Sequence, residues 1–155
     1  MKPKLSRVLI SFTISIALTA LTYTNAWAAW IQTCNSLGGP NGSVLKGCNN
    51  YEYDYPSFGQ FAEYSSSQVS GQYQPQMNMF ADARPQDRCQ NADGSWQAWK
   101  GLGYTAKSGF GSYIQTNVAS GYYQNCTYGH QYRSESYHTW WYGSYSNSTW
   151  VDKII

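Results

Sequence analysis

The pattern of hydrophobic and polar positions indicates a series of strands, of which residues 130–142, HQYRSESYHTWWY, form the central one. Alternate side chains of a strand share a face, and this stretch alternates over its whole length. One predicted face comprises His130, Tyr132, Ser134, Ser136, His138, Trp140 and Tyr142, and the other comprises Gln131, Arg133, Glu135, Tyr137, Thr139 and Trp141. Neither face is purely apolar, so the strand is inferred mainly from its residue types.

Shorter stretches predict the remaining strands, which are residues 51–55, 58–64, 68–73, 76–80, 110–118 and 150–155. In 76–80 the two methionines, Met77 and Met79, share a face and are expected in the core. The stretch 110–118 is the best candidate for a core strand, with Phe110, Ser112, Ile114, Thr116 and Val118 on one side. After residue 28, no segment longer than ten residues has a convincing helical period. The sequence therefore predicts an all-β fold, a small disulfide-stabilised antiparallel sandwich or barrel.

Turn-forming residues divide these strands. The run SLGGPNGS, residues 36–43, gathers glycine, proline and asparagine, so residues 30–50 are predicted to be a loop. Residues 84–95 end in Asn-Ala-Asp-Gly-Ser and are also predicted to be a loop. We expect a loop-rich N-terminal segment at 29–50 with a local disulfide, followed by a single β-rich domain at 51–155.

The first 28 residues have the three zones of a secretory signal peptide. Basic residues open the segment, an apolar stretch follows at 8–21, and Ala26-Trp27-Ala28 places small residues where a signal peptidase reads them. The apolar stretch is shorter than the roughly 20 residues that a membrane-spanning helix needs. We therefore expect cleavage before Ala29, a secreted protein (extracellular or periplasmic), and no membrane span in the mature chain.

Cleavage would change the charge of the chain. It removes three of ten basic residues and none of the eight acidic ones, so the net charge falls from +2 to −1. The remaining basic residues are scattered along the sequence: Lys46, Arg84, Arg88, Lys100, Lys107, Arg133 and Lys153. Nucleic-acid binding needs clustered positive charge, so we do not expect a nucleic-acid partner.

All four cysteines follow residue 28, and an even number in an exported chain predicts disulfides. We prefer Cys34–Cys48 and Cys89–Cys126 among the three possible pairings, because cysteines close in sequence pair most readily. Neither a Cys-x-x-Cys pair nor a histidine at ligand spacing is present, so a metal site is not expected. No cofactor motif is present either.

Catalytic motifs are largely missing. One alternative is a small secreted ribonuclease that uses Arg133, Glu135 and His138 for acid–base chemistry. In an unbroken strand, however, His138 points away from the other two residues. The two histidines, His130 and His138, are also eight residues apart, which is roughly 26 Å along a strand. We therefore expect a binding protein rather than an enzyme.

Aromatic residues offer the best indication of binding. Fourteen tyrosines and six tryptophans follow residue 28, and flat Tyr and Trp rings pack against the apolar faces of sugars. The candidate ligand-binding residues are Trp96, Trp99, Trp140 and Tyr142, with the tyrosines of 51–55 behind them. The competing interpretation is that these rings fill a core that is poor in Leu, Ile and Val.

Three functions follow from these observations. The first is a secreted, non-enzymatic module that binds glycans or a cell surface. The second is a bacteriocin-like toxin that acts on the envelope of another cell. The third is the ribonuclease.

Overall fold

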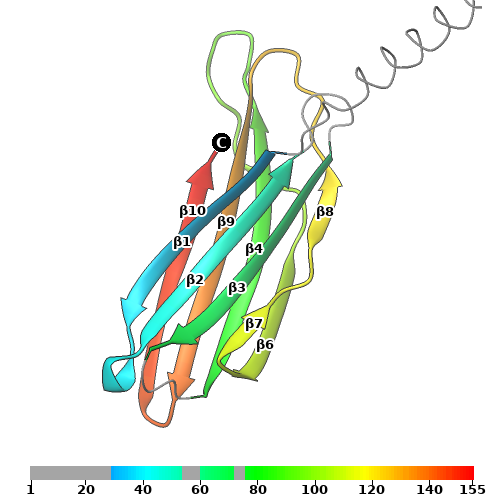
Figure 1. Ribbon diagram of the computed structural model, residues 1–155. Coiled ribbons are helices and arrows are strands. Elements are labelled where there is room, and N and C mark those ends of the chain that lie inside the picture. Colours follow the sequence, from blue (N-terminus) through cyan, green and yellow to red (C-terminus); the bar gives the residue numbers. More distant parts are fainter. Residues whose placement is uncertain (1–28, 54–59, 72–75) are drawn as a thin grey trace, which may run out of the picture.

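The protein is a sandwich of two antiparallel sheets, seen in a computed structural model that describes residues 29–53, 60–71 and 76–155 (Figure 1). Ten strands lie in the described residues, five in each sheet. The all-β, disulfide-stabilised fold expected from the sequence is therefore confirmed. The predicted signal peptide, residues 1–28, lies outside the described residues.

The first sheet has the order β1-β2-β3-β7, and β8 also pairs with β3. Its strands are β1 (Ala29–Gly38), β2 (Val44–Tyr53), β3 (Gln60–Ser70), β7 (Tyr113–Gln115) and β8 (Ala119–Tyr122). A short 3-10 turn, Pro40–Gly42, joins β1 to β2. Asn41 and Gly42 have positive φ in this turn, a conformation that asparagine and glycine tolerate best.

The second sheet has the order β10-β9-β4-β5, and β6 also pairs with β4. Its strands are β4 (Met77–Cys89), β5 (Lys100–Gly101), β6 (Thr105–Gly111), β9 (His130–Tyr142) and β10 (Tyr145–Ile154). The bounds of β9 are those predicted from the sequence, and its buried residues occupy every second position from Tyr132 to Trp140, all on one of the two faces described above.

Both side edges of the sandwich are partly closed. At one edge the chain passes from the second sheet to the first between β6 and β7, where Gly111 has a φ of 157° and Val69 N–H donates to Ser112 O. At the other edge β1 and β10 are joined by side chains: Asn35 Nδ2 donates to Trp150 O, and the Tyr145 hydroxyl donates to Gly38 O. These bonds cover part of each strand edge.

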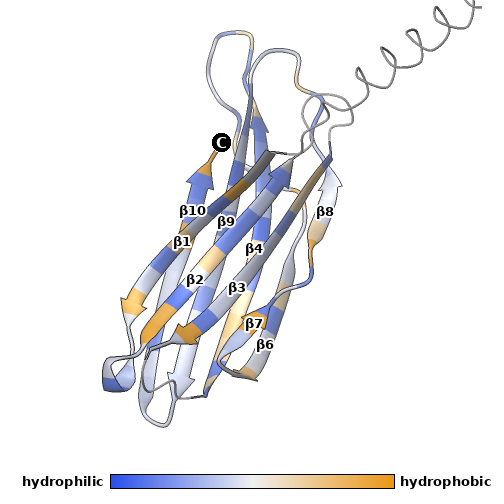
Figure 2. Ribbon diagram, in the orientation of Figure 1, coloured by the Kyte–Doolittle hydropathy of each residue, from blue (hydrophilic) through white to orange (hydrophobic). Residues whose placement is uncertain are grey.

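The described interior contains two hydrophobic clusters separated by polar residues. The first cluster consists of Leu45, Val69, Met77, Met79, Ala81, Ile114 and Trp140, and the second consists of Tyr51, Phe61 and Tyr132. Between them lies what we call the polar belt, which comprises Asn49, Glu63, Ser65, Ser67, Ser134, Ser136 and His138, all buried. Figure 2 shows hydrophobic residues on β2 and β3 near the β1–β2 turn, a more hydrophilic stretch beyond them, and hydrophobic colour again toward the other end of β3. The expected burial of Met77 and Met79 is confirmed.

The polar belt joins the two sheets by hydrogen bonds from side chains of β3 to the backbone of β4. The Ser67 hydroxyl donates to Phe80 O at 2.8 Å, and the Ser65 hydroxyl donates to Asp82 O. Two residues further along, Glu63 Oε1 accepts the backbone N–H of Arg84 at 3.1 Å. Consecutive inward side chains of β3 therefore each hold a position on β4, and we call this set the inter-sheet ladder.

His138 completes the polar belt in a neutral form. Its Nδ1 lies 3.0 Å from the Ser67 hydroxyl, and its Nε2 lies 2.8 Å from the Ser136 hydroxyl. Because Ser67 already donates its proton to Phe80 O, Nδ1–H must donate to Ser67, and Nε2 then accepts from Ser136. Burial lowers the pKa of His138 to about 4, which keeps the ring uncharged at neutral pH. The ring packs over Gly47, where an added Cβ would lie 2.5 Å from it.

Several expectations about local structure are wrong. Residues 60–70 form one continuous strand, β3, where two strands with a break between them were predicted. Residues 30–50 are not a loop, because the turn chemistry is confined to residues 39–43 and the flanking residues form β1 and β2. The predicted loop at 84–95 begins only after Cys89, since β4 continues through Pro85. Residues 110–118 are not one core strand, because the chain changes sheets after Gly111. Ile114 is buried there, but Phe110 and Val118 are exposed.

Both predicted disulfides are confirmed. Cys34 and Cys48 face each other across β1 and β2, and Cys89 at the end of β4 is joined to Cys126 in the segment before β9. Within residues 29–53, 60–71 and 76–155, no helix has the length and apolar character needed to cross a membrane.

Candidate ligand-binding surface

The outer face of the second sheet gathers arginine and aromatic side chains. Alternate residues of β4, β9 and β10 point away from the core, and the segment between β4 and β6 contributes rings at the edge. The surface, which we call the arginine face, comprises Arg84, Gln86, Arg88, Trp96, Trp99, Tyr104, Gln131, Arg133, Glu135, Tyr137, Trp150 and Asp152. All three arginines in the described part of the chain belong to it.

At one end of the arginine face, Arg88 lies against two tryptophans. Its guanidinium carbon is 4.3 Å from the ring centre of Trp99 and 5.1 Å from that of Trp96. These are cation–π distances. Nε and Nη2 of Arg88 both donate to Oε1 of Gln131, at 2.9 Å and 2.7 Å. The arginine is thus fixed by neutral groups.

In the middle of the face, Arg133 is neutralised by acids. Its Nε and Nη2 donate to the two carboxylate oxygens of Asp152 at 2.9 Å and 2.8 Å, and Nη2 lies 3.4 Å from Glu135. The hydrogen bonds to Asp152 raise the pKa of Arg133 further above its ordinary value. Gln86 donates to Glu135 at 2.9 Å, so this part of the face is an internally satisfied polar network.

Toward the other end, Arg84 combines an acid with two rings. Its Nε and Nη2 donate to Oδ2 of Asp82, a carboxylate that is completely buried. The other oxygen of Asp82 accepts the backbone N–H of Tyr137 at 2.7 Å. The Arg84 guanidinium lies 4.9 Å from the ring of Trp150 and 5.6 Å from that of Tyr104. Trp150, 46% exposed, also packs on Tyr137.

The structure places the four predicted ligand-binding residues in three different settings. Trp96 and Trp99 come together around Arg88 on the arginine face. Trp140 is completely buried in the first hydrophobic cluster, so its setting matches the core interpretation. Tyr142 is exposed but lies at the opposite end of β9, eleven residues from Gln131 and therefore roughly 37 Å away. Of the tyrosines in 51–55, Tyr51 is buried and Tyr55 lies outside the described residues.

Sequence reasoning missed the arginines of this face. Arg88 fell in the predicted loop 84–95, so its alternation with Arg84 and Gln86 was not recognised. Arg133 was placed on the correct face of the central strand, but only as part of a possible ribonuclease site. The pairing of β4 with β9, which sets Arg88 beside Gln131, is a long-range contact that no local pattern signals.

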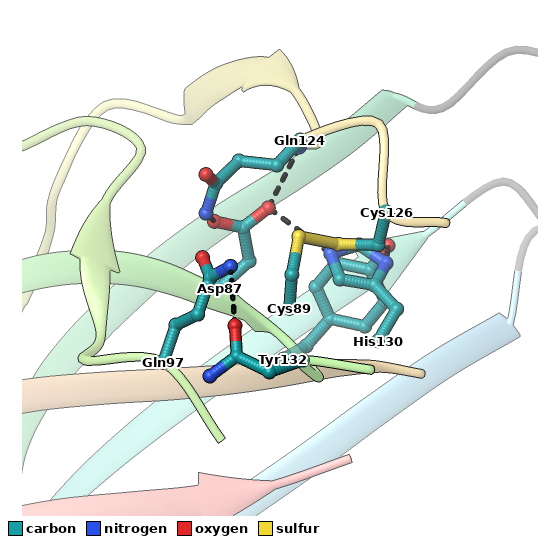
Figure 3. The surroundings of a disulfide bond; sticks show 8 residues. Asp87, Cys89, Gln97, Gln124, Cys126, His130 and Tyr132 are labelled. Carbon is teal, nitrogen blue, oxygen red and sulfur yellow. Dashed lines mark hydrogen bonds and ion pairs between the residues drawn. A yellow bond between two sulfur atoms is a disulfide. The ribbon is translucent and has the colours of Figure 1, made fainter. Parts of the chain in front are cut away.

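A second cluster of polar groups lies at the end of the sandwich beside the Cys89–Cys126 disulfide (Figure 3). The buried carboxylate of Asp87 accepts the backbone and side-chain N–H groups of Gln124 and the Nε2–H of His130, which is 3.0 Å away. The other ring nitrogen of His130 accepts the hydroxyl of Tyr132. These bonds attach the segment before β9 to β4.

This cluster continues into the second hydrophobic cluster. The rings of Tyr132 and Tyr123 are 4.1 Å apart, and the Tyr51 hydroxyl donates to that of Tyr123 at 3.2 Å. Burial, followed by the contact with Tyr123, raises the pKa of Tyr51 above its ordinary value. The aspartate, histidine and tyrosine groups thus adjoin packed rings, and their hydrogen bonds link the segment before β9 to the second hydrophobic cluster.

A polar depression of about 210 Å³ lies near the same disulfide, between residues 89–97 and 125–128. Amide and hydroxyl groups line it, and its volume is below the roughly 300 Å³ at which small-molecule pockets begin. Among the described residues, no group of three or more histidine, cysteine, aspartate or glutamate side chains could hold a metal ion.

The residues considered for ribonuclease chemistry do not meet in one site. His138 is completely buried between the sheets, whereas Arg133 and Glu135 lie on the arginine face. His130, the other histidine, is hydrogen-bonded to Asp87 at the end of the sandwich.

No protein-family model, curated protein or solved structure matches this chain.

Proposed function

We propose that the protein is a secreted, non-enzymatic binding module for glycans, and that the arginine face is its contact surface. The single observation that carries this proposal is the grouping of aromatic rings with arginines on the arginine face, where Arg84 and Arg88 each lie against two rings that are partly or fully exposed. The disulfides support secretion, because such bonds persist mainly outside the cytosol.

The chemistry of the surface suits a polyhydroxyl ligand. Exposed tryptophan and tyrosine rings provide flat apolar area for the CH faces of sugars. Beside them, the arginines, Gln86 and Gln131 provide hydrogen-bond donors and acceptors for hydroxyl groups. Many of these side chains are already fixed by one another, which reduces the entropy that binding would lose.

The test is a glycan array, followed by affinity measurements on the polysaccharides retained, with secreted protein produced from the full chain. Trp99→Ala should weaken binding about fivefold or more, since a stacking ring is worth about 1 kcal/mol or more. Tyr122→Ala, which removes a 71% exposed ring from β8 in the other sheet, is the matched control and should bind normally.

Trp99→Phe separates binding from folding, because it retains a ring on Arg88 and should keep most of the affinity. Circular dichroism and thermal melting confirm that each variant is folded. Absence of glycan retention by the wild type, or equal weakening by Trp99→Ala and Tyr122→Ala, would contradict the proposal.

A further inference from the structure

The three arginines of the arginine face differ in how their charge is balanced. Arg84 is paired with Asp82, and Arg133 with Asp152 and Glu135. Arg88, in contrast, has no acidic partner within salt-bridge distance among the described residues. Its hydrogen-bonded neighbour is the neutral amide of Gln131. One end of the surface therefore holds a positive charge without a counterion.

The remaining donors of Arg88 are available. Gln131 occupies Nε and one proton of Nη2, both through a single oxygen. In the part of the chain that the structure describes, Nη1 has no acceptor. A guanidinium presents its N–H groups as a fork that matches the two oxygens of a carboxylate. The bond to Gln131 and the contacts with Trp96 and Trp99 hold this fork in place before any ligand arrives.

The surroundings of Arg88 strengthen its attraction for an anion. Trp96 and Trp99 are both half-buried, so they exclude part of the water around the guanidinium while leaving ring surface accessible. A charge pair that is partly shielded from water is stronger than one in bulk solvent. The same rings can stack on the sugar that bears the anion.

We infer that this site binds an acidic glycan, in which Arg88 pairs with the carboxylate of a uronic acid and the two tryptophans contact its ring. This inference rests on the proposed glycan-binding function and names its ligand class.

The experiment compares polysaccharides that differ only in charge. The probes are polygalacturonate, hyaluronate and heparosan, each beside its carboxyl-reduced form, with affinity measured by isothermal titration calorimetry or affinity electrophoresis. Wild-type protein should bind at least one acid form about tenfold or more tightly than the reduced form. This preference should shrink as salt is raised, because the pair is only partly buried.

Arg88→Gln should remove the preference by weakening the acid form about tenfold while leaving the reduced form unchanged. Arg88→Lys, which retains the charge but not the fork, should keep the preference at lower affinity. Lys46→Gln, which removes one positive charge from β2 in the other sheet, is the matched control and should behave as the wild type.

The possible failures are distinguishable. If the protein binds glycans through Trp99 but Arg88→Gln lowers both forms equally, or acid and reduced forms bind alike, the acidic ligand is refuted and the binding function stands. If the wild type retains no glycan on the array, both proposals fall.

Discussion

Replacement of Glu63 by glutamine should stabilise the protein increasingly as the pH rises. Burial between the sheets raises the pKa of Glu63 to about 8, against an ordinary value of 4.5. This effect outweighs the hydrogen bonds from Asn49, the Arg84 backbone and Ser134, which favour the charged form. The folded protein therefore keeps the proton that the unfolded chain releases near pH 4.5, and stability falls as the pH rises from 4.5 to about 8.

The magnitude follows from that pH interval. Each pH unit between 4.5 and about 8 corresponds to about 1.4 kcal/mol, which makes a total of roughly 5 kcal/mol. Glutamine does not titrate, and its carbonyl can still accept from Asn49 Nδ2 and Arg84 N–H, which Glu63 Oε1 now accepts at 3.0 Å and 3.1 Å. The variant and the wild type should be similar near pH 4.5 and diverge steadily above it.

Urea denaturation at half-unit steps from pH 4.5 to 8.5 measures this difference in the free energy of unfolding. Glu52→Gln, which changes an exposed carboxyl on the neighbouring strand, reports the effect of losing one surface charge. A difference between Glu63→Gln and wild type that stays constant over this range would show that Glu63 is already ionised in the folded protein, and would refute the reasoning.

Three further predictions concern the same interior and its cross-links. Gly47→Ala should destabilise the protein by about 1–3 kcal/mol in thermal or urea unfolding, because its Cβ would overlap the His138 ring, whereas Gly38→Ala has open space and should be near neutral. Because burial lowers the pKa of His138 in the folded protein, the free energy of unfolding should fall by up to roughly 3 kcal/mol as the pH falls from 6.5 to about 4. His138→Gln should lack this pH dependence, which is measured as the difference in the free energy of unfolding between the variant and the wild type at each pH. Replacing both Cys89 and Cys126 by alanine should lower the free energy of unfolding by roughly 4 kcal/mol, and an unchanged urea midpoint would contradict the cross-linking account.

The parts of the fold that were predictable are those set by local pattern. Residues 130–142 are rich in strand-favouring residue types, and these predicted the bounds of β9 and the division of its side chains between two faces, though not which of the two faces is buried. The disulfides followed from cysteine spacing, since Cys34 and Cys48 are close enough in sequence to define one hairpin. The strand is predicted by its own residues, whereas the disulfides are predicted by the order of four cysteines that pair over 14 and 37 residues.

The errors arose where a contact distant in sequence decides the structure. The turn residues near Gly39 suggested a wide loop, but pairing of the flanking residues across the Cys34–Cys48 bridge extends both strands. Phe110 and Ile114 would share a face in one continuous strand. The change of sheet after Gly111 resets the alternation, so Phe110 is exposed and Ile114 is buried.

Part of the candidate site was hidden for a similar reason. Trp140 is buried and Trp99 is partly exposed, but residue type does not distinguish them, and alternation alone does not show which face of a mixed strand is buried. The interior of the polar belt is filled by serine, asparagine, glutamate and histidine, residues that a sequence pattern normally assigns to the surface. Only the stacking of β2 and β3 on β4 and β9 shows which rings are buried and which remain at the surface.

The inter-sheet ladder has a consequence for how the two layers find their mutual alignment during folding. Apolar contacts between the sheets can be kept when one sheet shifts relative to the other, because they are not directional. The hydrogen bonds are directional: Ser67 must bond to Phe80 O and His138 at the same time, and Glu63 must accept the N–H of Arg84. If the sheets packed in a shifted position, these polar groups would be buried without hydrogen-bond partners, at a free-energy cost of about 1–3 kcal/mol for each group. The polar belt therefore favours the native alignment of the two sheets over shifted alignments that would bury the same apolar area.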